Sequence, residues 1–279
     1  MLRYFYFFSA VLLLCSACTD SNDGALSAES AAVGAEGQGG SWARFTVEGD
    51  YLYTVTEQSL NVFDIREPEQ PTFVQDVWLG DDIETIYARE SVLFIGSQVG
   101  MQIFSLRQPA APERLSWIQH RDAVRCPVEV DGETRWELPF GLNETSDPVV
   151  ADRTHAYLTL KTQADCPDAN GNRATVDIDQ LIVFDIRDLQ NPVRIANYLM
   201  EDPEGLGLWN DLLFVCDEGL KVYDRTRPDS LVQVNFYDIP AYDVIPLYQS
   251  LLVTADDGFH QYDIRGEELE YVSSIRIGE

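Results

Sequence analysis

The side chains of this chain that could perform chemistry are few and scattered. Three histidines, His120, His155 and His260, occur in 279 residues, and they fall at unrelated points of the sequence. Apart from Cys15 and Cys18 near the N-terminus, the sequence has no CxxC pair, and it has no HExxH, glycine-rich phosphate loop or nucleophile elbow. These are the spacings that metal, phosphate and acyl-transfer chemistry use. From these motifs we predict no catalytic residue, no metal ligand and no cofactor.

One short stretch has the ligand types of a calcium loop. Asp168, Asn170, Asn172 and Asp177 place carboxylate and amide oxygens at spacings that partly follow an EF-hand. Cys166, however, occupies the first ligand position, and Asp177 stands where an EF-hand has glutamate. An Asn-Gly hairpin turn explains the same residues more simply, and both interpretations stay open at this point.

Carboxylates are the other candidate chemistry, because the chain has 47 acidic residues. Two or three of them converging on a central pocket would suit a carbohydrate-active hydrolase. The strands that we expect at the centre of the fold contain few such groups, chiefly Glu84 and Asp243, with Asp152 at one edge and Arg44 as a basic residue.

The segments that must position these side chains repeat five times. Each copy ends in an apolar strand that, in four of the five, closes on an aspartate, and an earlier apolar strand precedes it. The five endings are SLNVFDI at 59–65, GMQIFSL at 100–106, QLIVFDI at 180–186, GLKVYDR at 219–225 and GFHQYDI at 258–264. Copies are about forty residues apart, except that the third contains insertions.

Each copy contains four short runs rich in valine, isoleucine, tyrosine and phenylalanine, separated by turn residues and prolines. Four strands in about forty residues is the size of a propeller blade. We therefore predict an all-β fold, a five-bladed β-propeller of four-stranded antiparallel blades over 41–279. The innermost strands are expected at 42–47, 83–87, 148–152, 205–209 and 242–246, and the last strand, EYVSSIRI, could close the ring against the first blade.

The repeat resembles the LVIVD repeat family, whose copies continue into an Asp-Ile-Ser-turn-Pro pattern that FDIRDLQNPV matches closely. The resemblance extends over nearly all of 41–279 and is weakest in the second copy, where Ser105 replaces the aspartate. It implies a bacterial β-propeller and does not imply an activity.

The recurring aspartate stands between a strand and a turn, where its carboxylate can accept hydrogen bonds from backbone N–H groups. An arginine follows it in four copies, at Arg66, Arg187, Arg225 and Arg265. We interpret both as structural; a ring of catalytic acids is the alternative.

The third copy has two insertions, at 121–147 and 161–179. In an antiparallel blade the start of the first strand and the end of the second lie at the same side, so both insertions should emerge on one face. Each contains one cysteine beside a proline, and in an oxidising compartment we predict a Cys126–Cys166 disulfide between them. Cys216 lies in an apolar strand and is expected to be a buried free thiol.

The insertions are the best candidate for specific binding, since loops on a rigid scaffold commonly bind partners. Trp136 and Phe140 could provide apolar contacts on that face. Alternatively, they pack down over the centre of the propeller.

The first 17 residues have the features of an export signal. Arg3 precedes an apolar run from Tyr4 to Leu14 that is too short to span a bilayer. The small residues before Cys18 resemble a bacterial lipobox, which implies that Cys18 receives a lipid; an ordinary signal peptide cleaved nearby is the alternative. By resemblance to lipoprotein sorting signals, Thr19 favours the outer membrane.

Residues 18–40 are small and acidic, with no aromatic residue, lysine or arginine, so we predict a flexible tether. The whole chain has a net charge of −28, which disfavours nucleic acid as a partner. The sequence therefore predicts a lipid-anchored protein of the cell envelope, exported and membrane-attached through its N-terminal lipid. We expect this protein to act as a non-enzymatic binding or scaffold propeller with a protein or glycan partner. The alternative is an extracytoplasmic carbohydrate-active hydrolase.

Overall fold

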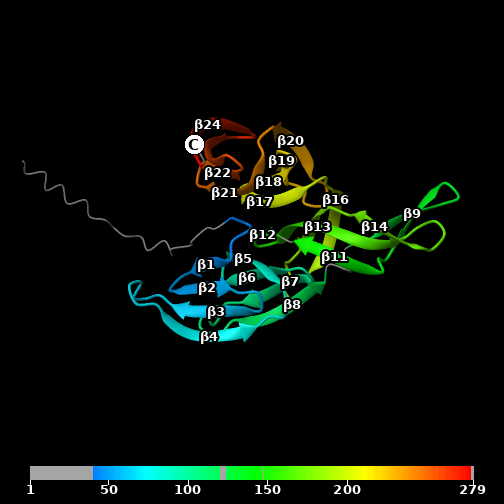
Figure 1. The fold of residues 1–279 in the computed structure, drawn as a ribbon. Helices are drawn as coiled ribbons and strands as arrows, with labels where there is room; N and C mark the ends of the chain where they lie inside the picture. The colour runs from blue at the N-terminus through cyan, green and yellow to red at the C-terminus, as the bar shows by residue number, and fades with distance from the viewer. Residues whose placement is uncertain (1–39, 120–123, 147, 278–279) are drawn as a thin grey trace, which may run out of the picture. The chain divides into compact units, whose positions relative to one another are not determined.

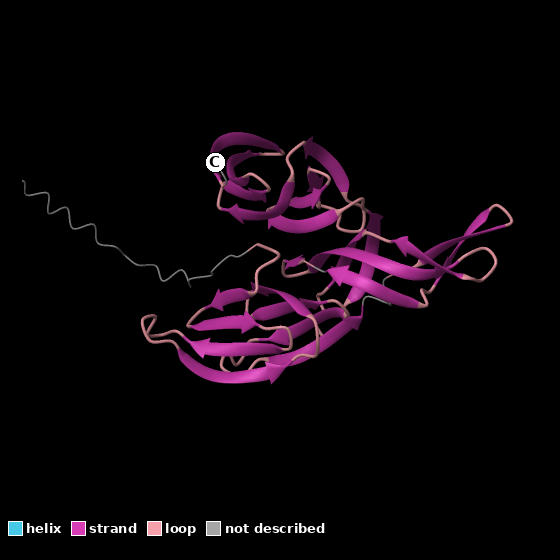
Figure 2. Cartoon of the chain, viewed as in Figure 1, coloured by secondary structure: helices cyan, strands magenta, loops and turns pink. Residues whose placement is uncertain are grey.

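The computed structural model describes residues 40–119, 124–146 and 148–277, and all regular elements in these ranges are β-strands (Figure 2). Twenty of the described strands form five four-stranded antiparallel units, the blades of a five-bladed β-propeller, and four more strands extend the third blade (Figure 1). The predicted fold class is confirmed. None of the described residues belongs to a helix long and apolar enough to cross a bilayer.

Four blades are plain, with strands in chain order from the centre outward. Blade one contains β1 (Phe45–Glu48), β2 (Tyr51–Val55), β3 (Ser59–Asp64) and β4 (Thr72–Trp78). Blade two contains β5 (Ile83–Arg89), β6 (Val92–Ser97), β7 (Gly100–Ser105) and β8 (Glu113–Gln119). Blade four contains β17 (Pro203–Trp209), β18 (Leu212–Asp217), β19 (Leu220–Asp224) and β20 (Val232–Tyr237). Blade five contains β21 (Ala241–Leu247), β22 (Ser250–Ala255), β23 (Gly258–Arg265) and β24 (Glu268–Arg276).

Blade three is enlarged. Its four propeller strands are β12 (Val149–Ala151), β13 (His155–Pro167), β15 (Gln180–Asp185) and β16 (Val193–Leu199). The second half of β13 runs beyond the blade and pairs with two further strands, β11 (Gly141–Ser146) and β14 (Arg173–Asp177). A separate hairpin consists of β9 (Cys126–Val130) and β10 (Glu133–Glu137). We call these four strands and the end of β13 the blade-three extension.

Apolar clusters join neighbouring blades. In the described residues one cluster lies between blades one and two, and others lie between two and three, three and four, and four and five. The alternation of each strand explains this: in β15, Leu181 and Val183 face blade four, whereas Ile182 and Phe184 face blade two. Both faces of blades two, three and four are therefore buried, whereas the strands of blades one and five alternate between buried and partly exposed side chains.

The chain before blade one crosses the centre of the propeller. The Ala43 carbonyl accepts a hydrogen bond from Ile86 N in blade two (2.8 Å), and Ser41 Oγ accepts one from Leu206 N in blade four (2.9 Å). Ser41 Oγ also donates to Asp243 Oδ1 in blade five (2.9 Å). Residues 40–44 thus connect three blades at the hub.

The last strand does not close the ring against blade one. β24 pairs with β23 over its whole length and is the outermost strand of blade five. The reason is strand count: blade five already has its three inner strands in β21, β22 and β23, so the final strand completes the same blade.

Candidate functional site

The recurring aspartate has the structural role that the sequence predicts. Asp64 Oδ1 accepts a hydrogen bond from Arg66 N (3.0 Å), and Asp185 Oδ1 accepts one from Arg187 N (3.0 Å). In blade two the hydroxyl of Ser105 replaces the carboxylate and accepts from the backbone two residues on (3.2 Å). Together with the bond from Thr226 N to Asp224 Oδ1, these bonds hold the turn after the third strand in blades one to four.

The arginines are not equivalent to one another. Arg66, Arg187 and Arg265 each stand two residues after the aspartate and pair with it. Arg225 stands only one residue after Asp224, and it pairs with Asp152 of blade three (2.5 Å). All four arginines closely follow the motif aspartate in the sequence, and the difference of one residue in spacing is the signal that distinguishes Arg225.

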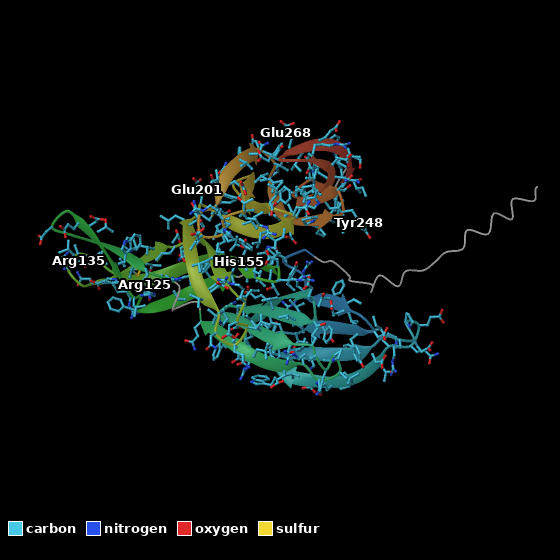
Figure 3. All side chains as sticks on the ribbon, turned by 180° about the vertical axis from the view of Figure 1, so that it is seen from behind. Arg125, Arg135, His155, Glu201, Tyr248 and Glu268 are labelled. Carbon is cyan, nitrogen blue, oxygen red and sulfur yellow. A yellow bond between two sulfur atoms is a disulfide. The ribbon has the colours of Figure 1, made fainter. Side chains whose placement is uncertain are left out.

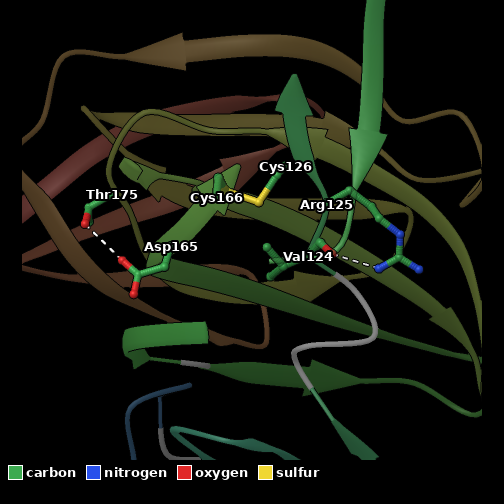
Figure 4. Close-up of a disulfide and its surroundings, with 6 residues drawn as sticks. All are labelled: Val124, Arg125, Cys126, Asp165, Cys166 and Thr175. Carbon is green, nitrogen blue, oxygen red and sulfur yellow. Dashed lines mark hydrogen bonds between the residues drawn. A yellow bond between two sulfur atoms is a disulfide. The ribbon is translucent and has the colours of Figure 1, made fainter. Parts of the chain in front are cut away.

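The predicted disulfide is present between Cys126 of β9 and Cys166 of β13, with Cα atoms 5.5 Å apart (Figure 4). Both cysteines are buried among apolar side chains that include Val124 and Val128. The two insertions also lie on one face, as predicted, because β11 and β14 flank the same stretch of β13. The bond fixes the β9–β10 hairpin to the extended sheet.

Trp136 and Phe140 are both exposed on the extension, at 58% and 48% of their surface. Their surroundings differ. Trp136 lies in β10 opposite Pro127 and lines a groove, whereas the Arg173 guanidinium lies over the Phe140 ring, 5.6 Å from its centroid. The alternative in which these rings pack down over the hub is wrong, since Phe140 N bonds Asp165 O (2.7 Å) on the outlying part of β13.

The groove beside Trp136 has a volume of about 480 Å³. Its floor is formed by the outer part of blade three, at Gln180 and residues 194–197 and 199, and Arg125 stands beside the hairpin (Figure 3). The groove is open and combines an aromatic wall with polar and basic groups, which suits binding of a partner surface.

The Asp168 carboxylate, a candidate calcium ligand, is engaged in hydrogen bonds of a turn. Asp168 Oδ1 accepts hydrogen bonds from Asn170 N and Asn172 N (both 2.8 Å), and Asn172 Nδ2 donates to Asp168 Oδ2 (3.2 Å). Gly171 has φ +78° at the tip of the β13–β14 hairpin. Among the described residues, no group of three or more histidine, cysteine or acidic side chains is placed to hold a metal ion.

The hub carboxylate Asp243 is buried and already engaged. It accepts hydrogen bonds from Ser41 N (3.3 Å), Ser41 Oγ (2.9 Å), Trp42 N (3.4 Å) and Val244 N (2.9 Å). Burial raises the pKa of Asp243, and these donors oppose the rise. Asp243 therefore anchors the chain at the hub, and the hydrolase alternative would need other acids.

Cys216 is a buried free thiol in β18, as predicted, and burial raises its pKa well above the usual range. A thiol in that state is a weak nucleophile, because the thiolate is the reactive form. Cys216 thus packs between blades four and five as a small apolar residue.

These features define the class of protein as a five-bladed β-propeller with one enlarged, disulfide-bonded blade. No protein-family model matches the chain, and no curated protein matches it. Solved structures with a similar fold include proposed 6-phosphogluconolactonases from Bacteroides fragilis (11% identity, 82% of each chain, TM-score 0.46) and Bacteroides uniformis (12% identity, 82% of this chain and 83% of that one, TM-score 0.47). A Lactobacillus plantarum protein is also similar (10% identity, 81% of each chain, TM-score 0.44).

Proposed function

We propose that this chain is an exported, lipid-anchored β-propeller of the LVIVD repeat kind that acts as a binding or scaffold protein in the bacterial cell envelope, in the outer membrane. The observation that carries the proposal is the blade-three extension, a disulfide-bonded sheet with exposed aromatic side chains that has no counterpart on the other four blades. Its partner is a protein or glycan outside the cytoplasm.

The anchor rests on the lipobox-like sequence before Cys18, which lies outside the described residues. The disulfide supports export, because such bonds persist in oxidising compartments. The acidic stretch that follows Cys18 would keep the propeller at a distance from the membrane while allowing it to reorient.

Cys18→Ser is expected to abolish acylation and to move the protein from the membrane fraction to the soluble fraction, because serine has no thiol to receive the lipid. Metabolic labelling with an alkyne fatty acid, followed by fractionation, measures both effects. Cys15→Ser is the matched control and should label like the wild type. Labelling of the Cys18→Ser variant at the wild-type level would contradict the lipid anchor at Cys18.

The binding surface rests on Trp136, Leu138 and Phe140, which expose 58%, 53% and 48% of their surface along one edge of the extension. Aromatic side chains on a rigid support provide much contact area with little loss of conformational entropy. The disulfide and the pairing with β13 provide that support.

A photo-crosslinking amino acid at position 136 is expected to join the membrane-attached, full-length protein to one discrete partner. The control is the same amino acid at Trp78, a tryptophan of similar exposure (61%) on β4, the outer strand of blade one. Gel shifts after irradiation of intact cells measure the yield. Equal yields at both positions would refute a specific surface on blade three, and turnover of a glycoside that depends on hub residues would refute a purely binding role.

A further inference from the structure

One position in the repeat departs from its four counterparts. The residue after the motif aspartate donates its backbone N–H to the turn between the first two strands of its own blade, at 2.7–2.9 Å in all five blades. In four blades that residue is aliphatic, and three of these side chains expose 5% or less. The five equivalent residues are Ile65, Leu106, Ile186, Arg225 and Ile264.

Arg225 therefore places a guanidinium where the fold otherwise buries an aliphatic side chain, and only 14% of its side chain is exposed. Its Nη1 donates to Asp152 (2.5 Å) and to Tyr157 Oη (3.4 Å), and its Nη2 donates to the Asn210 carbonyl (2.5 Å). The guanidinium also lies over the Tyr157 ring, 5.6 Å from the centroid.

This arrangement leaves the guanidinium incompletely satisfied. An arginine side chain has five N–H donors, and Arg225 Nε is buried without a hydrogen-bond partner in the described part of the chain. A buried charge in place of an apolar residue is unfavourable for folding unless it is fully compensated. Such local departures from an otherwise regular pattern concentrate at functional sites.

A cavity of about 370 Å³ opens beside Arg225 where the first strands of blades two to five end. We call it the hub-mouth cavity. Its lining combines two basic groups and one acidic group with aromatic rings and an amide: Arg89, Arg225, Asp152, Trp209, Tyr248 and Asn210. It lies at the start of β13, whereas the blade-three extension is built on the end of the same strand. The two ends of this thirteen-residue strand are at most about 40 Å apart.

Two aromatic side chains at the hub-mouth cavity, Tyr248 and Trp209, are held in place at its edge. Tyr248 has φ +56° at the tip of the β21–β22 turn and exposes 93% of its surface, at the edge of blade five (Figure 3). A bulky side chain in the left-handed region is strained, and asparagine or glycine is the usual residue there. The Tyr248 carbonyl accepts the indole N–H of Trp209, which fixes the neighbouring ring.

We propose that the hub-mouth cavity binds a single sugar ring that bears a carboxylate, a hexuronate unit. The carboxylate pairs with Arg225 and Arg89, because planar guanidinium groups match carboxylates. The apolar face of the ring lies against Trp209 and Tyr248, and its hydroxyl groups donate to Asp152 and the Asn210 side chain. The volume is near the lower end for ligand sites, which fits one ring.

The charge around the hub mouth agrees with an anionic ligand. The whole chain has a net charge of −28, yet Arg89, Arg153 and Arg225 gather here, and Glu90 pairs with the first two of these. Asp152 pairs with Arg225, and two further acidic residues, Glu48 and Asp211, lie at the adjoining turns of blades two and four. The three arginines are the groups at this end of the hub that would pair with an anionic ligand.

Calorimetric titration of the whole protein with D-galacturonate and D-glucuronate is expected to give at least tenfold tighter binding than with galactose and glucose. Arg225→Ile restores the residue type of the other blades, and Asp152 keeps its hydrogen bonds from Thr154 and His155, so we expect a folded variant with at least tenfold weaker uronate binding. Arg187→Ile, an exposed arginine at the motif of blade three, is the matched control and should bind normally. Titration with glucose 6-phosphate tests whether the site prefers a sugar whose negative charge is a phosphate rather than a carboxylate.

Tyr248→Asn tests the site without altering Arg225. Asparagine tolerates the left-handed turn, so the fold should be kept, and loss of the aromatic ring should weaken uronate binding severalfold. Equal affinity for uronate and neutral sugar, tighter binding of the sugar phosphate than of either uronate, or normal binding by the Arg225→Ile and Tyr248→Asn variants would overturn the proposal. The crosslink at position 136 reports on the other end of β13, so failure at the hub mouth and failure of the blade-three surface are distinguishable.

Discussion

Asp243→Ala is expected to lower the free energy of unfolding by about 3 kcal/mol, because it leaves buried donors of Ser41 and Trp42 without their acceptor. The loss should be larger than for a surface acid since Asp243 exposes only 8% of its surface. Chemical denaturation with a two-state fit measures it. The segment at 40–42 should also become accessible to proteolysis, since its link to blade five is through this carboxylate.

Ser41→Ala separates the two halves of this contact. It removes the hydroxyl that joins Asp243 to Leu206 N but leaves the backbone bonds, so a loss of about 1 to 2 kcal/mol is expected. In the double variant the two losses should not add, because both act on one hydrogen-bonded unit. Asp229→Ala, in an exposed turn, is the control and should change nothing. Additive losses would refute the coupling.

The pKa of Asp243 gives a second readout. Burial raises this pKa above its unfolded value, so the folded state holds the proton more tightly than the unfolded chain does. The contribution of the group is then fully present below the unfolded pKa and decreases as the pH rises through the folded pKa. Asp243→Asn should remove this decrease, and the stability difference between wild type and variant should therefore change with pH in that direction.

The strands of the plain blades could be predicted because their signals are local. Apolar runs such as SLNVFDI and the aspartate at their ends recur at a spacing that matches one blade, and β3, β7, β15, β19 and β23 lie at those positions. Antiparallel geometry then placed the two insertions on one face, since that inference needs only strand direction. The Cys126–Cys166 bond followed from it.

The hub could not be predicted in the same way, because its contacts are not local. Ser41 and Asp243 are 202 residues apart in the sequence. Ser41 directly follows a stretch whose composition is that of a tether, and nothing in its neighbours indicates burial. Gly40 shows the same limit: an added Cβ would lie 1.8 Å from Asp243 Oδ2, a restriction that appears only when both segments are in place.

Arg225 is an intermediate case. The register of the repeat is sufficient to place it in the aliphatic position, one residue after Asp224, although an arginine near the motif aspartate in four copies suggests that all four pair with that aspartate. Its partner, Asp152, belongs to another blade, in the one turn between first and second strands that is longer than two residues. The pocket that they share could therefore be found only in three dimensions.

Removing the disulfide is expected to destabilise the protein by about 4 kcal/mol in the double variant Cys126→Ala, Cys166→Ala. The bond closes a loop with a sequence separation of 40, and restricting the unfolded chain by a loop of that length is worth about this much in the chain-entropy model. Alanine leaves no buried hydroxyl, so the measurement by guanidinium unfolding reports the crosslink together with the loss of two buried sulfur atoms.

The location of the bond predicts where the structure loosens first. Cys126 is the first residue of β9, and its hairpin partner β10 pairs only with β9 among the described strands, so the disulfide is the main covalent restraint on Trp136. Amide hydrogen exchange should therefore rise in residues 126–137 of the double variant while blades four and five keep their protection. Cys216→Ala, at a cysteine outside the disulfide, is the control and should leave exchange in the hairpin unchanged. If the hairpin amides of the double variant are as protected from exchange as those of the wild type, then packing of Val124 and Val128, rather than the crosslink, holds the extension in place.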